Sequence, residues 1–268
     1  MHHPRRLVAA GAALAVLLAP LTSTTGVAVA QDDPPGAPGA PATWTNGDKD
    51  GVGTALSRDS KVWYTLTGGT LSETYYPAAD TPNVRELQFV VSDGATFSQR
   101  ETDDTQRVVQ LADTRSLTYR QITTDNANRW RLTKTYVTDP SRSTVLVDVV
   151  FDALSGGPYE LYALFDPSLA GTAAGDTGQT ADSTSGMALV GSDTHLPDTP
   201  IASALVATGG FTAASTGYAG ASDGWSDLGS DHRMDWTFPQ AGPGNIVQIP
   251  LRVGPRPVPP DDVTARGW

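Results

Sequence analysis

The stretch Ser116–Asp139, SLTYRQITTDNANRWRLTKTYVTD, shows the fold class most clearly, because it reads as two β-strands joined by a turn. Its second half alternates large apolar residues with polar ones, and the apolar set is Trp130, Leu132 and Tyr136. Alternation with a period of two marks a strand with one buried face. Asp and Asn favour turns, so we place the turn at Asp125–Asn128. The stretch therefore predicts an antiparallel hairpin with one face on a core.

Similar strand patterns continue along most of the chain. The segment Lys61–Tyr76, KVWYTLTGGTLSETYY, places two β-rich runs around Gly68-Gly69, which is a hairpin signal. The segment ELQFVVSDG ends in the turn pair Asp93-Gly94. Strand-like runs recur at about ten-residue spacing, and no amphipathic helix is evident after residue 30. The sequence predicts an all-β fold: a large antiparallel β-sandwich with few or no helices.

The two ends of the chain differ from this pattern. Residues 1–30 have a basic start, the apolar run LVAAGAALAVLLAPL and the small-residue site AVA, which predict a cleaved secretory signal peptide and a secreted, extracellular protein. Residues 31–43 are rich in Pro, Gly and Ala, and we expect a flexible leader. The β-sandwich domain is predicted for residues 44–253 and an irregular Pro-rich tail for residues 254–268.

Composition excludes several classes of partner. The net charge of −11 repels nucleic acid and anionic lipid, so we expect neither as a partner. No second long apolar run follows residue 30, so no membrane contact is expected. The chain has no Cys, so the fold depends on core burial rather than on disulfides.

Catalytic patterns are weak. After residue 30 the chain has only two histidines, His195 and His232, and neither lies in a motif typical of a triad or a zinc site. Glycoside hydrolysis needs two carboxylates at a fixed gap, but Glu73, Glu86 and Glu160 are scattered over the strand patterns. We therefore assign no catalytic residue, and the sequence leaves open whether the protein is an enzyme.

Calcium is the one cofactor for which the sequence contains candidate ligands. Asn46, Asp48, Asp50 and the following glycine resemble the first half of a calcium loop, but the twelfth position is Ser57 rather than Glu. The loop is therefore not an EF-hand, and ordinary turn chemistry explains the same residues. Asp48, Asp50 and Asp176 remain the candidate Ca²⁺ ligands, and no other cofactor is expected.

Aromatic side chains are candidates for carbohydrate contact, because their faces stack on sugar rings. Aromatic residues at strand spacing also serve as core, so the two readings stay open. Tyr75 and Tyr76 are adjacent on a strand and must point to opposite faces. The full set of aromatic candidates is Trp63, Tyr64, Tyr75, Tyr76, Tyr218 and Trp225.

Several longer segments together resemble a known family. They are GDKDGVGTA, KVWYTLTGGTLSETYYPAADTPNVRELQFVVSDG, RLTKTYVTDP, YELYALFDPSL and GYAGASDGWSDL, and they occur in the family's order from about Trp44 to about Leu251. They resemble the amino-terminal domain of bacterial glucoamylases and glucodextranases, glycoside hydrolase family 15. The resemblance implies a super-sandwich that precedes an α/α-barrel. In the family, that barrel carries two catalytic glutamates and hydrolyses α-glucosidic bonds with inversion.

The match has two departures. After NIVQIPLRV the resemblance leads us to expect a link to the barrel, whereas the chain continues as GPRPVPPDDVTARGW. This predicts a truncated or frame-shifted reading frame from about Val253 and no hydrolysis by this chain alone. In YYPAADTPNV, Ala78 stands where the family usually has Arg. The residues that we assign to carbohydrate or interdomain contact are Lys49, Trp63, Tyr75, Tyr76, Asp80 and Trp225.

Three functions follow as hypotheses. The first is a non-catalytic accessory domain of a secreted glucoamylase-like or glucodextranase-like enzyme, which supports and docks a glycosidase catalytic domain. The second is a stand-alone carbohydrate-binding module whose partner is an α-glucan of the starch or dextran type. The third is a calcium-stabilised exported sandwich with an unrelated role.

Overall fold

The computed structural model describes residues 33–193, 195 and 200–252, and within them the chain forms three antiparallel sheets. Sheet A has the order β1 (Gly51–Thr54), β2 (Trp63–Thr67), β3 (Thr70–Tyr75), β4 (Pro82–Ser92), β10 (Glu160–Pro167), β15 (Ile246–Arg252) and β14 (Ala213–Tyr218), with β5 (Ser98–Arg100) paired to β4. Sheet B has the order β6 (Thr105–Asp113), β7 (Thr118–Asp125), β8 (Trp130–Thr138) and β9 (Val145–Ala153). Sheet C has the order β11 (Asp176–Ser183), β12 (Gly186–Asp193) and β13 (Ala202–Val206).

Helical structure among the described residues is limited to α1 (Trp225–Asp231) and the short 3-10 turn η1 (Leu169–Gly171). Within the same part of the chain, no helix is long and apolar enough to cross a membrane. The prediction of an all-β sandwich is confirmed. The predicted signal peptide and the predicted truncation from about Val253 lie outside the described residues.

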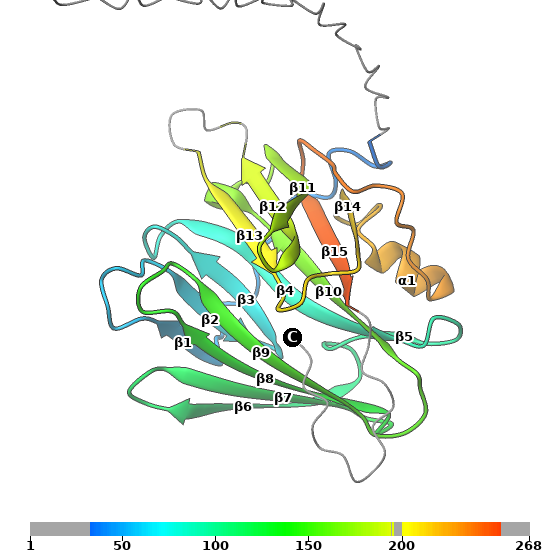
Figure 1. Cartoon of the computed structure of the whole chain (residues 1–268), viewed down its shortest axis with the longest axis horizontal. Coiled ribbons are helices and arrows are strands. Elements are labelled where there is room, and N and C mark those ends of the chain that lie inside the picture. The colour runs from blue at the N-terminus through cyan, green and yellow to red at the C-terminus, as the bar shows by residue number, and fades with distance from the viewer. Residues whose placement is uncertain (1–32, 194, 196–199, 253–268) are drawn as a thin grey trace, which may run out of the picture. The chain divides into compact units, whose positions relative to one another are not determined.

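The main core lies between the inner face of sheet A and the inner faces of sheets B and C (Figure 1). The alternation along β8 buries Trp130, Leu132 and Tyr136 in this core, as predicted. The ring of Tyr64 on β2 stacks against Tyr136 with their centres 6.0 Å apart. Gly53 faces the Tyr64 ring, and a Cβ at this position would come 2.3 Å from it. The close contact leaves room only for glycine on this part of β1.

A buried ion pair sits within the same core. Lys134 of β8 and Glu101, which follows β5, are both fully shielded from solvent and bond to each other. The Lys134 ammonium also donates to the Gly69 carbonyl at 2.7 Å, and Glu101 accepts the Phe89 amide at 3.0 Å. Burial raises the pKa of Glu101 and lowers the pKa of Lys134, so each charge depends on the other. The pair therefore joins sheet B to sheet A.

The described part of the predicted leader is hydrogen-bonded to sheet A and to the loops beside it. Pro38 and Ala40 exchange main-chain hydrogen bonds with Asn245 and Ala219, all at 2.8 Å. The side chain of Asn245 adds a bond to the Ala40 carbonyl, and Arg85 binds the Thr43 carbonyl. A segment with little apolar surface is thus held by main-chain hydrogen bonds, which its composition does not indicate.

The outer face of sheet A is covered unevenly. Leu228 of α1, together with Trp225 and Trp236, packs over Tyr162 and Ile249 on the β10 and β15 part of the sheet. Figure 1 shows α1 on this side and β1 and β2 on the opposite side of the view. Neither of the two described helices therefore covers the outer face at β1–β3.

The buried pair gives a test of the core. Lys134→Met should lower the free energy of unfolding by about 3–5 kcal/mol, because it leaves the Glu101 charge buried without a partner. Glu101→Gln in the same chain removes that charge and keeps an oxygen for the Phe89 amide. The double variant should therefore regain at least about 1 kcal/mol over Lys134→Met in urea unfolding. Equal losses in the single and double variants would contradict the assigned pair.

Candidate functional site

A row of side chains crosses the outer face of sheet A on β1–β4. Backbone pairing sets Thr54 opposite Trp63, Trp63 opposite Tyr75, and Tyr75 opposite Pro82. Directly paired residues of antiparallel strands point to the same face, with Cβ atoms roughly 5 Å apart. Tyr64, the neighbour of Trp63, is buried in the core, so the row points outward. Two aromatic rings therefore stand on neighbouring strands of an uncovered face.

Trp44 extends the row beyond Pro82. A Cβ added to Gly171 would lie 3.2 Å from Cγ of Pro82 and 3.7 Å from Cζ2 of the Trp44 ring, so both residues flank this glycine. Trp44 is 43% exposed and Trp63 is 38% exposed, whereas Tyr75 is half-buried. We call Trp44, Trp63, Tyr75 and Pro82 the aromatic row.

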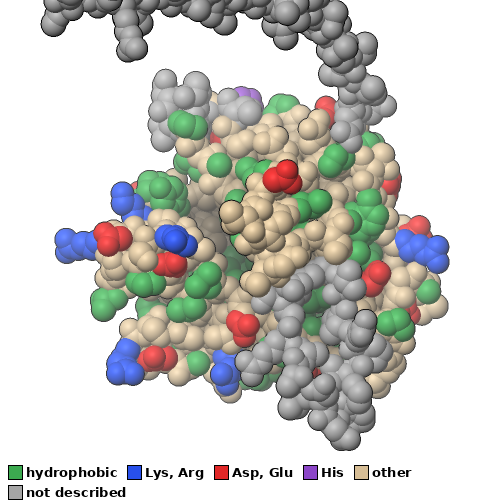
Figure 2. Space-filling view, viewed as in Figure 1, with side chains coloured by type: hydrophobic (Ala, Val, Ile, Leu, Met, Phe, Trp, Pro, Cys, Tyr) green, Lys and Arg blue, Asp and Glu red, His purple; other side chains and the backbone are tan. Residues whose placement is uncertain are grey.

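Tyr76 and Asp80 lie in the loop at the end of this row. The loop is closed by a bond from the Tyr76 amide to the Thr81 carbonyl at 2.9 Å. Asp80 is exposed and accepts the Thr81 hydroxyl at 3.2 Å. Tyr76 faces away from the row and lines a cavity of about 470 Å³ between sheet A, β9 and β13, a hollow that Figure 2 shows from outside. The side chains of the two adjacent tyrosines thus lie on opposite faces of the sheet.

Lys49 contacts its neighbours on the same outer face rather than open solvent. Its ammonium forms an ion pair with Glu73 of β3 and donates to the Thr45 hydroxyl at 2.7 Å. Burial alone would raise the pKa of Glu73, but hydrogen bonds from Lys49, Thr45 and Thr65 outweigh it and lower the pKa. The pair fixes the chain after Trp44 to β3 and so supports the aromatic row.

The three candidate calcium ligands do not come together. Asp48 and Asp50 line one shallow recess beside the β2–β3 turn, where the Asp50 carboxylate accepts the Gly68 amide at 2.9 Å. Asp176 lies on β11 of sheet C, where its carboxylate accepts the Leu169 amide at 3.0 Å. Among the described residues, no three Asp, Glu, His or Cys side chains are grouped to hold a metal. Calcium binding stays an untested prediction.

The remaining aromatic candidates lie elsewhere. Tyr64 and Tyr218 are buried, so neither is available to a ligand on the surface. Trp225 is the first residue of α1, with the Arg100 guanidinium 4.5 Å from its ring centre. It lines a separate cavity on the β4–β10–β15 part of the sheet. The structure therefore brings Lys49, Trp63 and Tyr75 to the β1–β3 part of the outer face and leaves Trp225 on another part of that face.

Comparison with known proteins agrees with this architecture. The sequence model of "Glucodextranase, domain N" matches residues 34–252. The chain belongs to the glucodextranase domain N family. The match begins within residues 31–43, so the hydrogen-bonded leader is part of the domain N match.

Two glucoamylases show where a domain N of this kind is found. A glucoamylase of Clostridium sp. (strain G0005) is 34% identical over 213 residues, which cover 79% of this chain and 30% of that protein. The crystal structure of a bacterial glucoamylase complexed with acarbose superposes with a TM-score of 0.76 at 32% identity, covering 82% of this chain and 32% of the other. The chain thus spans about a third of the glucoamylases that it matches.

Sequence reasoning missed two parts of this face. The contact residues assigned from the sequence do not include Trp44, although it lies just before the Lys49 loop and beside Pro82. Glu73 was grouped with scattered carboxylates, yet Lys49 is its ion-pair partner. The neighbours of Glu73 on β3 are Ser72 and Thr74, so no local pattern in the sequence indicates that this acid is buried and paired.

Asp176 provides a pH test of domain N. Burial raises its pKa to about 7, the Leu169 amide opposes the shift, and the nearby Asp193 adds to it. The folded state therefore holds a proton that the unfolded state loses near pH 4, so this group contributes less stability as the pH rises from about 4 to 7. In the wild type, this group lowers the free energy of unfolding by up to about 1.4 kcal/mol for each pH unit of that rise. Asp176→Asn should remove this contribution to the slope, as measured by urea unfolding at several pH values.

The matched control is Asp152→Asn, since Asp152 lies in an exposed pair with Arg131. Its unfolding free energy should keep the wild-type slope between pH 4 and 7. A slope left unchanged by Asp176→Asn would show that Asp176 does not hold the proton.

Proposed function

We propose that this domain N is the non-catalytic accessory domain of a glucoamylase-type or glucodextranase-type α-glucan hydrolase. Its aromatic row forms the contact with an α/α-barrel catalytic domain. The observation that carries the proposal is the exposed Trp63 paired with the half-buried Tyr75, on a part of sheet A that neither described helix covers. Support comes from the glucoamylases that share this domain, since domain N accounts for about a third of each.

The chemistry of the row suits an interdomain contact. Tryptophan and tyrosine dominate the binding energy of protein interfaces, and they act best when the surrounding residues exclude water. Trp44, Trp63 and Pro82 supply the apolar surface, while the Lys49–Glu73 pair and the Tyr76–Thr81 loop form a polar rim. The rim is already hydrogen-bonded within the domain, so docking leaves few polar groups without partners.

Docking is tested by soluble co-expression of residues 31–268 with the barrel of a related glucoamylase. Trp63→Ala and Tyr75→Ala should each weaken co-purification at least tenfold, equivalent to about 1.4 kcal/mol or more, because each removes an aromatic anchor. Leu111→Ala is the matched control, since Leu111 is 44% exposed on β6 of sheet B. Equal recovery of the barrel with all three variants would refute the contact.

A second candidate function is binding of starch or dextran by the same row. The observation in its favour is the register that sets Trp63 beside Tyr75, because two neighbouring rings can stack on successive sugar units. Affinity electrophoresis of residues 31–268 in gels with starch, dextran or neither separates the two functions. Retardation that Trp63→Ala abolishes supports glucan binding, whereas migration unchanged by either polymer favours a purely docking role.

We also propose that the protein is exported, with residues 1–30 as its cleaved signal. The intact mass of the protein recovered from the culture medium should correspond to a chain that begins at Gln31. A mass that includes the first thirty residues would contradict the cleavage.

A further inference from the structure

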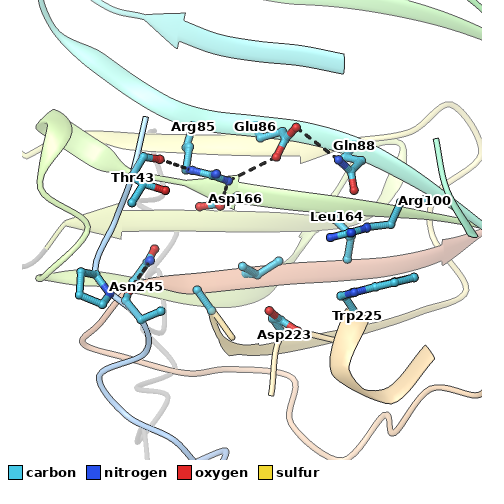
Figure 3. A pocket seen from close by; sticks show the side chains of 14 residues that line it. Thr43, Arg85, Glu86, Gln88, Arg100, Leu164, Asp166, Asp223, Trp225 and Asn245 are labelled. Atoms are coloured by element: carbon cyan, nitrogen blue, oxygen red, sulfur yellow. Dashed lines mark hydrogen bonds and ion pairs between the residues drawn. The ribbon is translucent and has the colours of Figure 1, made fainter. Parts of the chain in front are cut away.

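A second cavity lies on the outer face of sheet A, away from the aromatic row (Figure 3). Its floor is formed by β4, β10 and β15, and its walls by the leader around Thr43 and by α1. Its volume is about 240 Å³. Sites for drug-sized ligands measure about 300–1,000 Å³, so this cavity suits one small ring rather than a chain.

A β-bulge aims the polar side chains into this cavity. On β4, Glu86 pairs with Asp166 and Val84 pairs with Pro167, which leaves Arg85 unpaired between them. A bulge of this kind turns two consecutive side chains to one face, and bulges are frequent beside binding sites. Arg85 and Glu86 therefore both line the cavity, and Arg85 reaches the Asp166 carboxylate at 2.9 Å (Figure 3).

Two buried oxygens in the cavity wall have no partner. Asp166 is 8% exposed, and while one of its oxygens accepts Arg85, its Oδ1 has no hydrogen bond. Asn245 is 7% exposed; its Nδ2 donates to the Ala40 carbonyl at 2.7 Å, and its Oδ1 has no partner. The Ala40 carbonyl fixes the orientation of the Asn245 amide, because only the nitrogen can donate to it. Each buried acceptor without a hydrogen bond lowers the stability of the fold by about 1–3 kcal/mol, so a hydrogen-bond donor beside either oxygen would be stabilising.

The charges around the cavity favour a neutral donor. Arg85 is paired with Asp166 and Glu86, and Arg100 is paired with Asp103 while it stacks over Trp225. With both guanidinium groups already paired, the cavity has little attraction for an anion. The described residues also contain no group of three acidic side chains that would hold a metal cation. Hydroxyl groups are donors without charge and satisfy both oxygens.

The rest of the lining supplies an apolar wall. Leu164, Val247 and Trp225 line the cavity together with the polar groups, and Leu164 lies two residues before Asp166 on β10. A pyranose ring has hydroxyls at its edge and C–H groups on its faces, so it suits a lining that combines polar and apolar side chains.

We propose that this cavity binds a single neutral monosaccharide unit whose hydroxyls donate to Oδ1 of Asp166 and Oδ1 of Asn245. Leu164, Val247 and Trp225 contact the faces of the ring. The site is separate from the aromatic row and does not require docking of a catalytic barrel.

The test is calorimetric titration of residues 31–268 with D-glucose, with glucose 6-phosphate as the anionic probe. Saturable binding of glucose that weakens at least tenfold in Leu164→Phe is expected, because the larger side chain fills the cavity and leaves the polar groups intact. Asn245→Asp replaces the amide nitrogen with a second oxygen, so it loses the hydrogen bond to the Ala40 carbonyl that orients Oδ1 and should also weaken binding. Leu111→Ala, on β6 of sheet B and outside both sites, should leave the affinity unchanged.

Three results would overturn the proposal. The first is no saturable binding of glucose up to ~50 mM, well beyond the millimolar range of weak sites. The second is equal affinity in Leu164→Phe, which would place any bound sugar elsewhere. The third is a crystal structure in glucose that shows water alone between Asp166 and Asn245.

Discussion

The ion pair between Lys134 and Glu101 sets the relation between the two layers of this fold. Both side chains are fully buried, and together they satisfy the Gly69 carbonyl and the Phe89 amide from two different parts of sheet A. A buried charge is tolerated only when its partner is held at hydrogen-bond distance, so sheet B has little freedom to shift on sheet A. The stacked rings of Tyr64 and Tyr136 fill the space beside the pair.

Both proposed binding sites lie on the outer face of sheet A, away from this fixed interface between the sheets. The inner face packs against sheets B and C except at the cavity that Tyr76 lines, whereas the outer face is crossed by the leader and covered by α1 at only one end. The leader connects the two sites of that face: Thr43 binds Arg85 at the cavity, and Thr45 binds Glu73 beside the aromatic row. These hydrogen bonds thus hold the leader across the outer face of sheet A, between the cavity and the aromatic row.

Much of the architecture was predictable from local sequence, and the sites were less so. Strict alternation predicted β8 and its buried face, and paired Gly or Asp-Asn residues predicted the turns, because these signals depend on near neighbours. Lys134 lies on the apolar face of β8, but its partner is 33 residues away and no local pattern identifies it. The hydrogen-bond partners of the leader are also far away in the sequence, so no local pattern indicates them. Only Arg85-Glu86, two adjacent charges within a strand, gave a local sign of the bulge.

The most direct test of the account is hydroxyl-radical footprinting of domain N alone and in complex with the barrel of a related glucoamylase. If the uncovered end of sheet A is the docking face, oxidation of Trp63 and Tyr75 will fall on complex formation, while Val108 and Leu111 on sheet B will react as before. Protection of Val108 and Leu111 with unchanged oxidation of Trp63 and Tyr75 would contradict it.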